Sequence, residues 1–333
     1  MAKWEIPAPD RDYRERIDTL TTDAGSHVAN QHIVSRILLK GFASRGHGSS
    51  KGCQLTAFDV ERGRELTTRG LRGCAKVPAF LKFASKSAEA LWQEVETRLG
   101  PPIDVARSGN LHASHPYNDV IKDGIALHFV RSPRFLDVNQ ASAAEAMTGV
   151  RRETPYIRKD LLAAEFYRRY GFHAGGVEAL RVLLDKPLDD WQKLIDDGAL
   201  ARVSMEMMFE RVRATLQPLS LEILHVPPGC ELLISDAPAF TFCTDGRTGI
   251  TQVNMAIGDS HGIALPLARD CLAVISPDSL DAEITPEAVD MFNTIQVRIA
   301  RKQVYYHPSG ELRAFAETAA DRYRVATQRP SSP

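Results

Sequence analysis

Asp236 is the first residue in the sequence that could do acid or metal chemistry. It follows the apolar run Leu232–Ile234 and Ser235, and Pro238 ends strand pairing two residues later. A carboxylate at the end of a core strand loses hydration unless donors or a cation pair with it. We therefore predict that Asp236 is a functional acid or the ligand of a divalent cation, although Asp before x-Pro is also a common turn former.

His32 and Arg131 are the other two catalytic candidates. His32 titrates in the useful range, and we place it with Arg36 on one side of a helix expected over residues 28–41. Arg131 follows His128 by three residues, so both side chains lie on one helical face. A guanidinium suits a carboxylate or phosphate, but a cation at a helix C-terminus is also favoured by the helix dipole alone.

Uncharged polar residues complete the set of binding candidates. Ser235 immediately precedes Asp236, and Asn293 and Gln296 lie on one stripe of a late helix that also carries Val289. Amide side chains on an otherwise apolar stripe predict buried hydrogen bonds. We favour anchoring of the sheet over ligand binding as the use of these two amides.

Two other local matches lack the context that their chemistry needs. Ser260 fits G-x-S-x-G, but a nucleophile elbow needs a following helix, and Ile263–Leu267 is typical of a strand. His112 and His115 have the spacing of a metal-chelating pair, with no evident third ligand. Neither match is retained as a site.

The composition is that of a globular protein with a sizeable core. Hydrophobic residues make up 44% and charged residues 25% of the chain, and the formal net charge is −1. No global field therefore favours nucleic acid or an anionic membrane. Basic residues and tyrosines around Tyr167–His173 could bind single-stranded nucleic acid, but their acidic neighbours favour a solvated helix face.

The cellular location is predicted from the cysteines and the apolar runs. The five cysteines are scattered without a C-x-x-C pair, which indicates reduced thiols. The N-terminus lacks the apolar region of a secretory signal, and no apolar run is long enough to span a membrane. We expect a cytoplasmic protein without membrane contact.

The order of periodic segments predicts an α+β fold. A turn at Glu61–Gly63 predicts an early β-hairpin, and residues 85–99 predict a helix. Helical spacing dominates residues 102–218, after which short apolar runs separated by Pro, Gly and Asp indicate strands. We expect the hairpin and the late strands to form one mixed or antiparallel sheet, with the long helical middle packed against it.

These elements suggest three divisions of the chain. Residues 1–25 are expected to be an N-terminal extension, and residues 26–325 a single α+β domain with a helical insertion at about 102–218. A helix over residues 285–302, a strand at 304–306 and a charged helix end this domain. Residues 326–333 are expected to be a disordered tail.

Several short motifs occur in a fixed order: His32 to Phe42, a helix with Glu94 and Glu96, Arg131-Ser132-Pro133, Ser235 to Pro238, Leu265-Pro266-Leu267, and a late helix with Asn293 and Ala300. This order resembles domain-of-unknown-function family 4238, found mainly in bacteria, over roughly residues 30–306. The sequence has Ser35 where the family usually has proline. The resemblance implies a soluble intracellular protein of unassigned activity, and it supplies candidate positions without a mechanism.

Two functions of different classes remain open. The first is hydrolysis of a phosphodiester or another anionic substrate, nucleic acid included. His32 would be the general acid or base, Arg131 would stabilise developing charge, and Asp236 would orient His32 or hold a divalent cation. The second is non-catalytic ligand or partner binding, with the same residues in a polar network between sheet and helices. The hydrolase requires His32, Arg131 and Asp236 around one solvent-accessible cleft.

Overall fold

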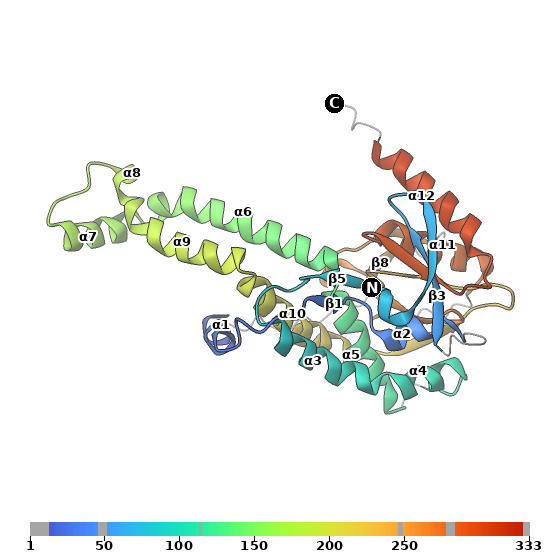
Figure 1. Ribbon diagram of the computed structural model, residues 1–333. Helices are drawn as coiled ribbons and strands as arrows, with labels where there is room; N and C mark the ends of the chain where they lie inside the picture. The colour runs from blue at the N-terminus through green and yellow to red at the C-terminus, as the bar shows by residue number, and fades with distance from the viewer. Residues whose placement is uncertain (1–12, 46–51, 113–114, 246–248, 278–283, 329–333) are drawn as a thin grey trace.

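The computed structural model describes residues 13–45, 52–112, 115–245, 249–277 and 284–328. In this part of the chain, antiparallel sheets and surrounding helices form a body from which a helical arm extends (Figure 1). The predicted α+β class is confirmed. The first half of the expected N-terminal extension, residues 1–12, and most of the expected tail, residues 329–333, lie outside the described residues.

One antiparallel sheet joins the early hairpin to two late strands. The central strand β3 pairs with β4, β2 and β12, and β12 also pairs with β7. The predicted hairpin and the predicted union of early and late strands are therefore confirmed. The five strands are β2 (Ser44–Arg45), β3 (Cys53–Asp59), β4 (Arg64–Gly70), β7 (Ile234–Ser235) and β12 (Gln303–Tyr306).

The other late strands form a second antiparallel sheet, which the sequence analysis did not predict as a separate sheet. Its order is β6-β11-β10-β8-β9. Strands β10 and β11 are buried along their whole length, which explains their uninterrupted apolar sequences. The strands are β6 (Leu221–His225), β8 (Phe240–Thr244), β9 (Ile250–Val253), β10 (Gly262–Ala268) and β11 (Cys271–Ile275).

The helix predicted over residues 28–41 is wrong for its first half. β1 (Asn30–His32) pairs with β5 (Lys76–Pro78), and only α2 (Arg36–Lys40) is helical. Buried Gln31 accepts the Leu81 N–H at 2.6 Å, so a tertiary contact holds this segment extended. His32 and Arg36 consequently lie on different elements rather than on one helical face.

Helices cover the body on several sides. The most deeply buried is α5, and the junction of α3 and α4 approaches it so closely that a Cβ at Gly124 would lie 2.7 Å from a methyl group of Leu99. The main apolar core includes residues of α2 to α5, α10 and both larger sheets. The body helices are α1 (Tyr13–Thr21), α3 (Ser85–Arg98), α4 (Gly100–Arg107), α5 (Tyr117–Val130), α10 (Ala199–Leu216), α11 (Pro286–Ile299) and α12 (Leu312–Gln328).

The remaining helices of the predicted helical middle form the arm. Helices α6 (Pro133–Ile157) and α9 (Val182–Asp196) run side by side away from the body, with α7 (Lys159–Tyr170) and α8 (Val177–Leu180) at the tip (Figure 1). The tip has its own small apolar cluster. Each long helix contains an internal proline, Pro155 in α6 and Pro187 in α9. None of the described helices is both long and apolar enough to cross a bilayer.

Candidate functional site

Arg131 lies at the centre of a buried polar cluster between β1, α3 and α5. Its side chain is 1% exposed, and its Nη1 lies 2.6 Å from Glu96 Oε1. Its Nε donates to the Ile33 carbonyl at 3.3 Å, and its guanidinium carbon lies 4.9 Å from the centre of the Trp92 ring. A carboxylate, a carbonyl and an aromatic face therefore compensate the buried charge.

Helix α3 directs one of its two neighbouring glutamates toward Arg131. Glu96 is four residues after buried Trp92 and faces inward, whereas Glu94 is exposed. Burial acts to raise the pKa of Glu96, but Arg131, His128 and a hydrogen bond with Ser35 together lower it below its usual value. Glu96 is therefore ionised and forms a true ion pair with Arg131.

Ser35 and His128 form a second buried pair beside this one. His128 Nε2 lies 3.1 Å from the Ser35 backbone nitrogen and 2.9 Å from Ser35 Oγ, and Nδ1 lies 2.7 Å from the Gly124 carbonyl oxygen. Because the Ser35 N–H can only donate, Nε2 is the acceptor and Nδ1 carries the proton. Burial and then Arg131 lower the pKa of His128 to about 4, so the ring is neutral at pH 7.

His128 is expected to make stability depend on pH. Its pKa is 6.5 in the unfolded chain and about 4 in the fold, so the unfolded state binds the proton more tightly. The stability contributed by the neutral ring is present above pH 6.5 and is lost as pH falls toward 4, by roughly 3 kcal/mol in total. Urea unfolding across this range should show the loss in the wild type and a weaker one in His128→Gln. Identical pH dependence of the two proteins would contradict this assignment.

His32 is the most exposed of the three catalytic candidates. Its side chain is partly buried, and its Nε2 atom is itself buried, without a hydrogen-bond partner within the described ranges. Burial, with Lys76 and Arg36 nearby, lowers the pKa of His32, which favours the neutral ring. Arg131 Nη2 is also buried without a partner there. Glu89, close enough to interact with Arg131, has its pKa raised by burial.

Asp236 is occupied by the turn between α11 and β12. Its Oδ1 accepts the Arg301 N–H at 2.8 Å, and its Oδ2 accepts the N–H groups of Lys302 and Gln303 at 2.9 and 3.0 Å. Burial raises the pKa of Asp236 to about 6, while these three donors favour the carboxylate. No hydrogen bond or ion pair joins Asp236 to His32 or Arg131 in the described structure, so the expected catalytic arrangement of the three is not assembled by direct contacts.

Ser235, Asn293 and Gln296 connect the segment 231–238 to α11. The two amides act as substitutes for a neighbouring strand, because each accepts one backbone N–H and donates to one carbonyl. The bonds are Leu233 N–H to Asn293 Oδ1 at 2.9 Å, Asn293 Nδ2 to Glu231 O at 2.8 Å, Ser235 N–H to Gln296 Oε1 at 2.9 Å and Gln296 Nε2 to Pro238 O at 2.9 Å. In addition, Ser235 Oγ accepts the Ala237 N–H at 3.2 Å.

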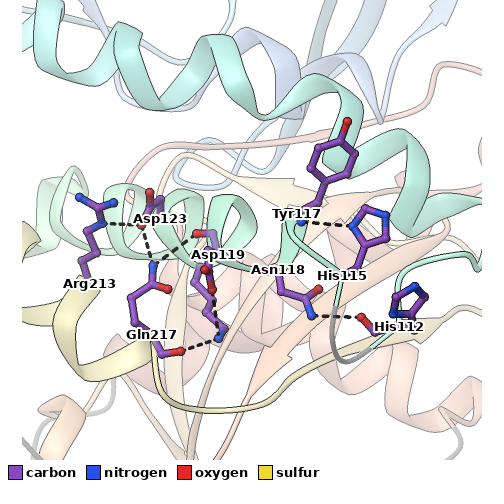
Figure 2. Close-up of polar contacts among 9 residues, drawn as sticks. His112, His115, Tyr117, Asn118, Asp119, Asp123, Arg213 and Gln217 are labelled. Atoms are coloured by element: carbon purple, nitrogen blue, oxygen red, sulfur yellow. Dashed lines mark hydrogen bonds and ion pairs between the residues drawn. The ribbon is translucent and has the colours of Figure 1, made fainter.

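A further carboxylate fixes the helix that carries His128 and Arg131. Asp123 Oδ1 accepts Arg213 Nε at 2.7 Å and Gln217 Nε2 at 3.0 Å, and Lys122 Nζ donates to the Gln217 carbonyl at 2.7 Å (Figure 2). Burial raises the pKa of Asp123, and Arg213 opposes this shift. The network ties α5 to the end of α10 and so holds the cluster in register.

The His112–His115 pair belongs to the start of α5 (Figure 2). His115 Nδ1 accepts the Tyr117 N–H at 3.1 Å, and the His112 carbonyl accepts Asn118 Nδ2 at 3.1 Å. These contacts link both histidines to the first two residues of the helix. Among the described residues, no group of three His, Cys, Asp or Glu side chains is arranged to hold a metal ion, at this pair or at Asp236.

A cleft of about 560 Å³ opens beside Glu96, and we call it the basic cleft. Its lining includes the exposed cations Arg36, Lys40 and Arg72, and Glu96 is the one acidic residue among its described lining residues. None of the three cations forms an ion pair with a carboxylate of the described chain. Because Arg131 neutralises Glu96, the cleft carries excess positive charge.

Sequence reasoning included Arg36 and left out Lys40, Arg72 and Trp92. The spacing of Trp92 and Glu96 by four residues on one helix was a usable signal for the inward carboxylate. Arg72 could not be found in this way, because it follows the hairpin in a short turn and reaches the cleft only through tertiary packing.

The fold and the cluster define an α+β protein in which three short motifs, from β1 to α2, from α3 and from α5, meet at one buried arginine. The chain belongs to the protein family of unknown function DUF4238, whose family model matches residues 30–310. The resemblance found in the sequence is therefore confirmed. Searches of curated proteins and of solved structures gave no significant match.

Proposed function

We propose that this protein is a ligand-binding module that takes a phosphate-bearing ligand in the basic cleft. The observation that carries this proposal is the set of three exposed cations, Arg36, Lys40 and Arg72, around one cleft. The one acidic residue among its described lining residues, Glu96, is neutralised by the buried Arg131. Guanidinium and ammonium groups without carboxylate partners are suited to phosphate oxygens. The cleft volume lies in the range of small-molecule sites.

Two uncharged or neutralised polar side chains on the lining of the cleft, Gln93 and Glu96, indicate a narrower class of ligand. Glu96, whose Oε1 is taken by Arg131 and whose side chain is 20% exposed, offers its other carboxylate oxygen as an acceptor, and Gln93 offers an amide. A ligand with a phosphate at one end and hydroxyl or amino donors at the other would match both parts. A mononucleotide or a sugar phosphate has this chemistry.

Neutralising two cleft cations is expected to weaken phosphate binding at least tenfold. The Arg36→Gln/Lys40→Gln variant loses charge-assisted contacts worth about 1.5–3 kcal/mol each. Titration calorimetry with pyrophosphate and with a nucleoside monophosphate, at low and at physiological salt, measures the change. Lys159→Gln/Lys186→Gln, which removes two exposed lysines of the arm, is the matched control and should bind like the wild type. Equal affinity in all three proteins would refute the proposal.

Hydrolysis of the bound anion is a second candidate, favoured by the position of His32 close enough to Arg36, a cation of the cleft, for their charges to interact. In this case His32 is the general base, and Arg131 supports the site through Glu96 without touching substrate. Turnover of a chromogenic phosphodiester by the wild type and by His32→Gln decides the matter. Equal rates would exclude His32 as the general base, and absence of turnover in both proteins would exclude hydrolysis; either result leaves the binding proposal intact.

A further inference from the structure

We infer that a second cavity, at the base of the arm, binds a monoanion with an apolar chain, such as a medium-chain carboxylate. This basal pocket has a volume of about 540 Å³ and lies between the start of α6, one face of α10 and residues 254–259. It shares no lining residue with the basic cleft, so the inference is independent of the proposed function.

The walls of the basal pocket are largely apolar. Phe129, Phe135 and Val212 form part of them, and Met208 and Met255 add flexible thioether side chains that adapt to an irregular ligand. Val138, also on the lining, is 55% exposed. An apolar ligand in the pocket would remove such surface from water, which is the main driving force for binding in small-molecule sites of this kind.

Two arginines give the pocket its preference for an anion. Arg134 and Arg211 both line it, and neither forms an ion pair with a carboxylate of the described residues. Arg211 Nε is buried without a hydrogen-bond partner in the described part of the chain, whereas Arg134 reaches the Asn254 carbonyl only at 3.4 Å. Because neither guanidinium is paired with a carboxylate there, an anionic head group in the pocket would supply the missing countercharge.

The charge on the opposite lining limits the head group to one negative charge. Asp259 is exposed and also lines the pocket. Its carboxylate repels a phosphate dianion more strongly than a carboxylate monoanion. A single anionic head on an apolar chain therefore fits the pocket better than the phosphate-bearing ligand of the basic cleft.

Rigid neighbours hold the pocket open. Ser132 and Ala237 both line it, and each directly follows a buried charged residue, Arg131 or Asp236, that is fixed by its own contacts. The segments 131–133 and 235–238 therefore each support part of the wall. A preformed wall reduces the entropy lost on binding.

Titration calorimetry of the full chain with octanoate, decanoate and dodecanoate tests the inference. We expect saturable binding at one site and an affinity that rises up to about fourfold per added methylene until the cavity is full. Decanoate should bind at least tenfold more tightly than decylammonium. No saturable binding, no dependence on chain length, or equal affinity for decylammonium would each overturn the inference.

Two variants assign this binding to the basal pocket. Arg211→Met should weaken decanoate binding at least tenfold and leave decanol binding unchanged. Arg211→Lys keeps the positive charge and should bind decanoate more tightly than decanol, so it tests the same point if the methionine variant does not fold. Ala256→Trp fills the pocket from an exposed lining position and should abolish the binding of both ligands. Unchanged decanoate affinity in Ala256→Trp would overturn the inference.

The last controls distinguish ligand binding in the basal pocket from ligand binding in the basic cleft and from self-association of the chain. Arg36→Gln/Lys40→Gln should keep full decanoate affinity, so a failure of the basic cleft and a failure of the basal pocket give different results. Sedimentation of the wild type and of Ala256→Trp tests whether a second copy of the chain covers the pocket instead. A dimer that the tryptophan abolishes would overturn the ligand assignment.

Discussion

Replacement of Arg131 by methionine is expected to lower the free energy of unfolding by about 3–5 kcal/mol. Methionine retains much of the side-chain volume, so the loss arises mainly from charge. Glu96, whose side chain is only 20% exposed, would be left as a partly buried carboxylate without its cation. The Ile33 carbonyl and the Trp92 ring would lose their contacts with the guanidinium. Urea unfolding followed by circular dichroism measures the change.

Comparison variants separate the ion pair from simple packing. Glu96→Gln removes the charge that needs Arg131, so the double variant Arg131→Met/Glu96→Gln should be more stable than the sum of the single losses indicates. Glu94→Gln, on the exposed side of the same helix, should unfold within about 0.5 kcal/mol of the wild type. A loss below about 1 kcal/mol in Arg131→Met is the value typical of a surface pair and would show that this pair does not support the fold.

Asp236→Asn is expected to cost about 2–3 kcal/mol, although it preserves the shape of the side chain. The amide offers one acceptor oxygen in place of two, and its NH₂ group would face a backbone N–H of residues 301–303. The turn between α11 and β12 would then hold a buried donor without an acceptor. Thermal and urea unfolding both report the loss.

The control for Asp236→Asn is Asp290→Asn, an exposed aspartate on α11. It makes the same chemical change and should stay within about 0.5 kcal/mol of the wild type. If Asp236→Asn instead unfolds like the wild type and loses turnover of an anionic substrate, Asp236 becomes a catalytic candidate again.

The parts of the fold with strong local periodicity were predictable. The hairpin β3–β4, the helix α3 and the buried strands β10 and β11 all have the expected alternation or apolar runs. The helix predicted over residues 28–41 was wrong in its first half because β1 is only three residues long and pairs with β5, more than forty residues later. Its apolar residues at helical spacing were a misleading signal.

The candidate site was predictable only in part, because most of its contacts join distant residues. The end of a core strand was correctly recognised as the place of a fixed carboxylate. However, the partners of Asp236 are three backbone N–H groups 65 to 67 residues later, and backbone donors leave no trace in residue types. The pairing of Arg131 with Glu96 was within reach, since the helical period excludes Glu94 from the inner face.

Pro155 and Pro187 give the arm a mechanical weak point. The ion pair between Arg151 and Asp189 shows that α6 and α9, which run in opposite directions, place their prolines at nearly the same height. Each proline removes one N–H from its helical hydrogen-bond ladder. The bending stiffness of both helices is therefore lowest at the same distance from the body. The tip is held together by its own apolar cluster, so it can tilt as a unit about this point while the part of the arm next to the body keeps its orientation.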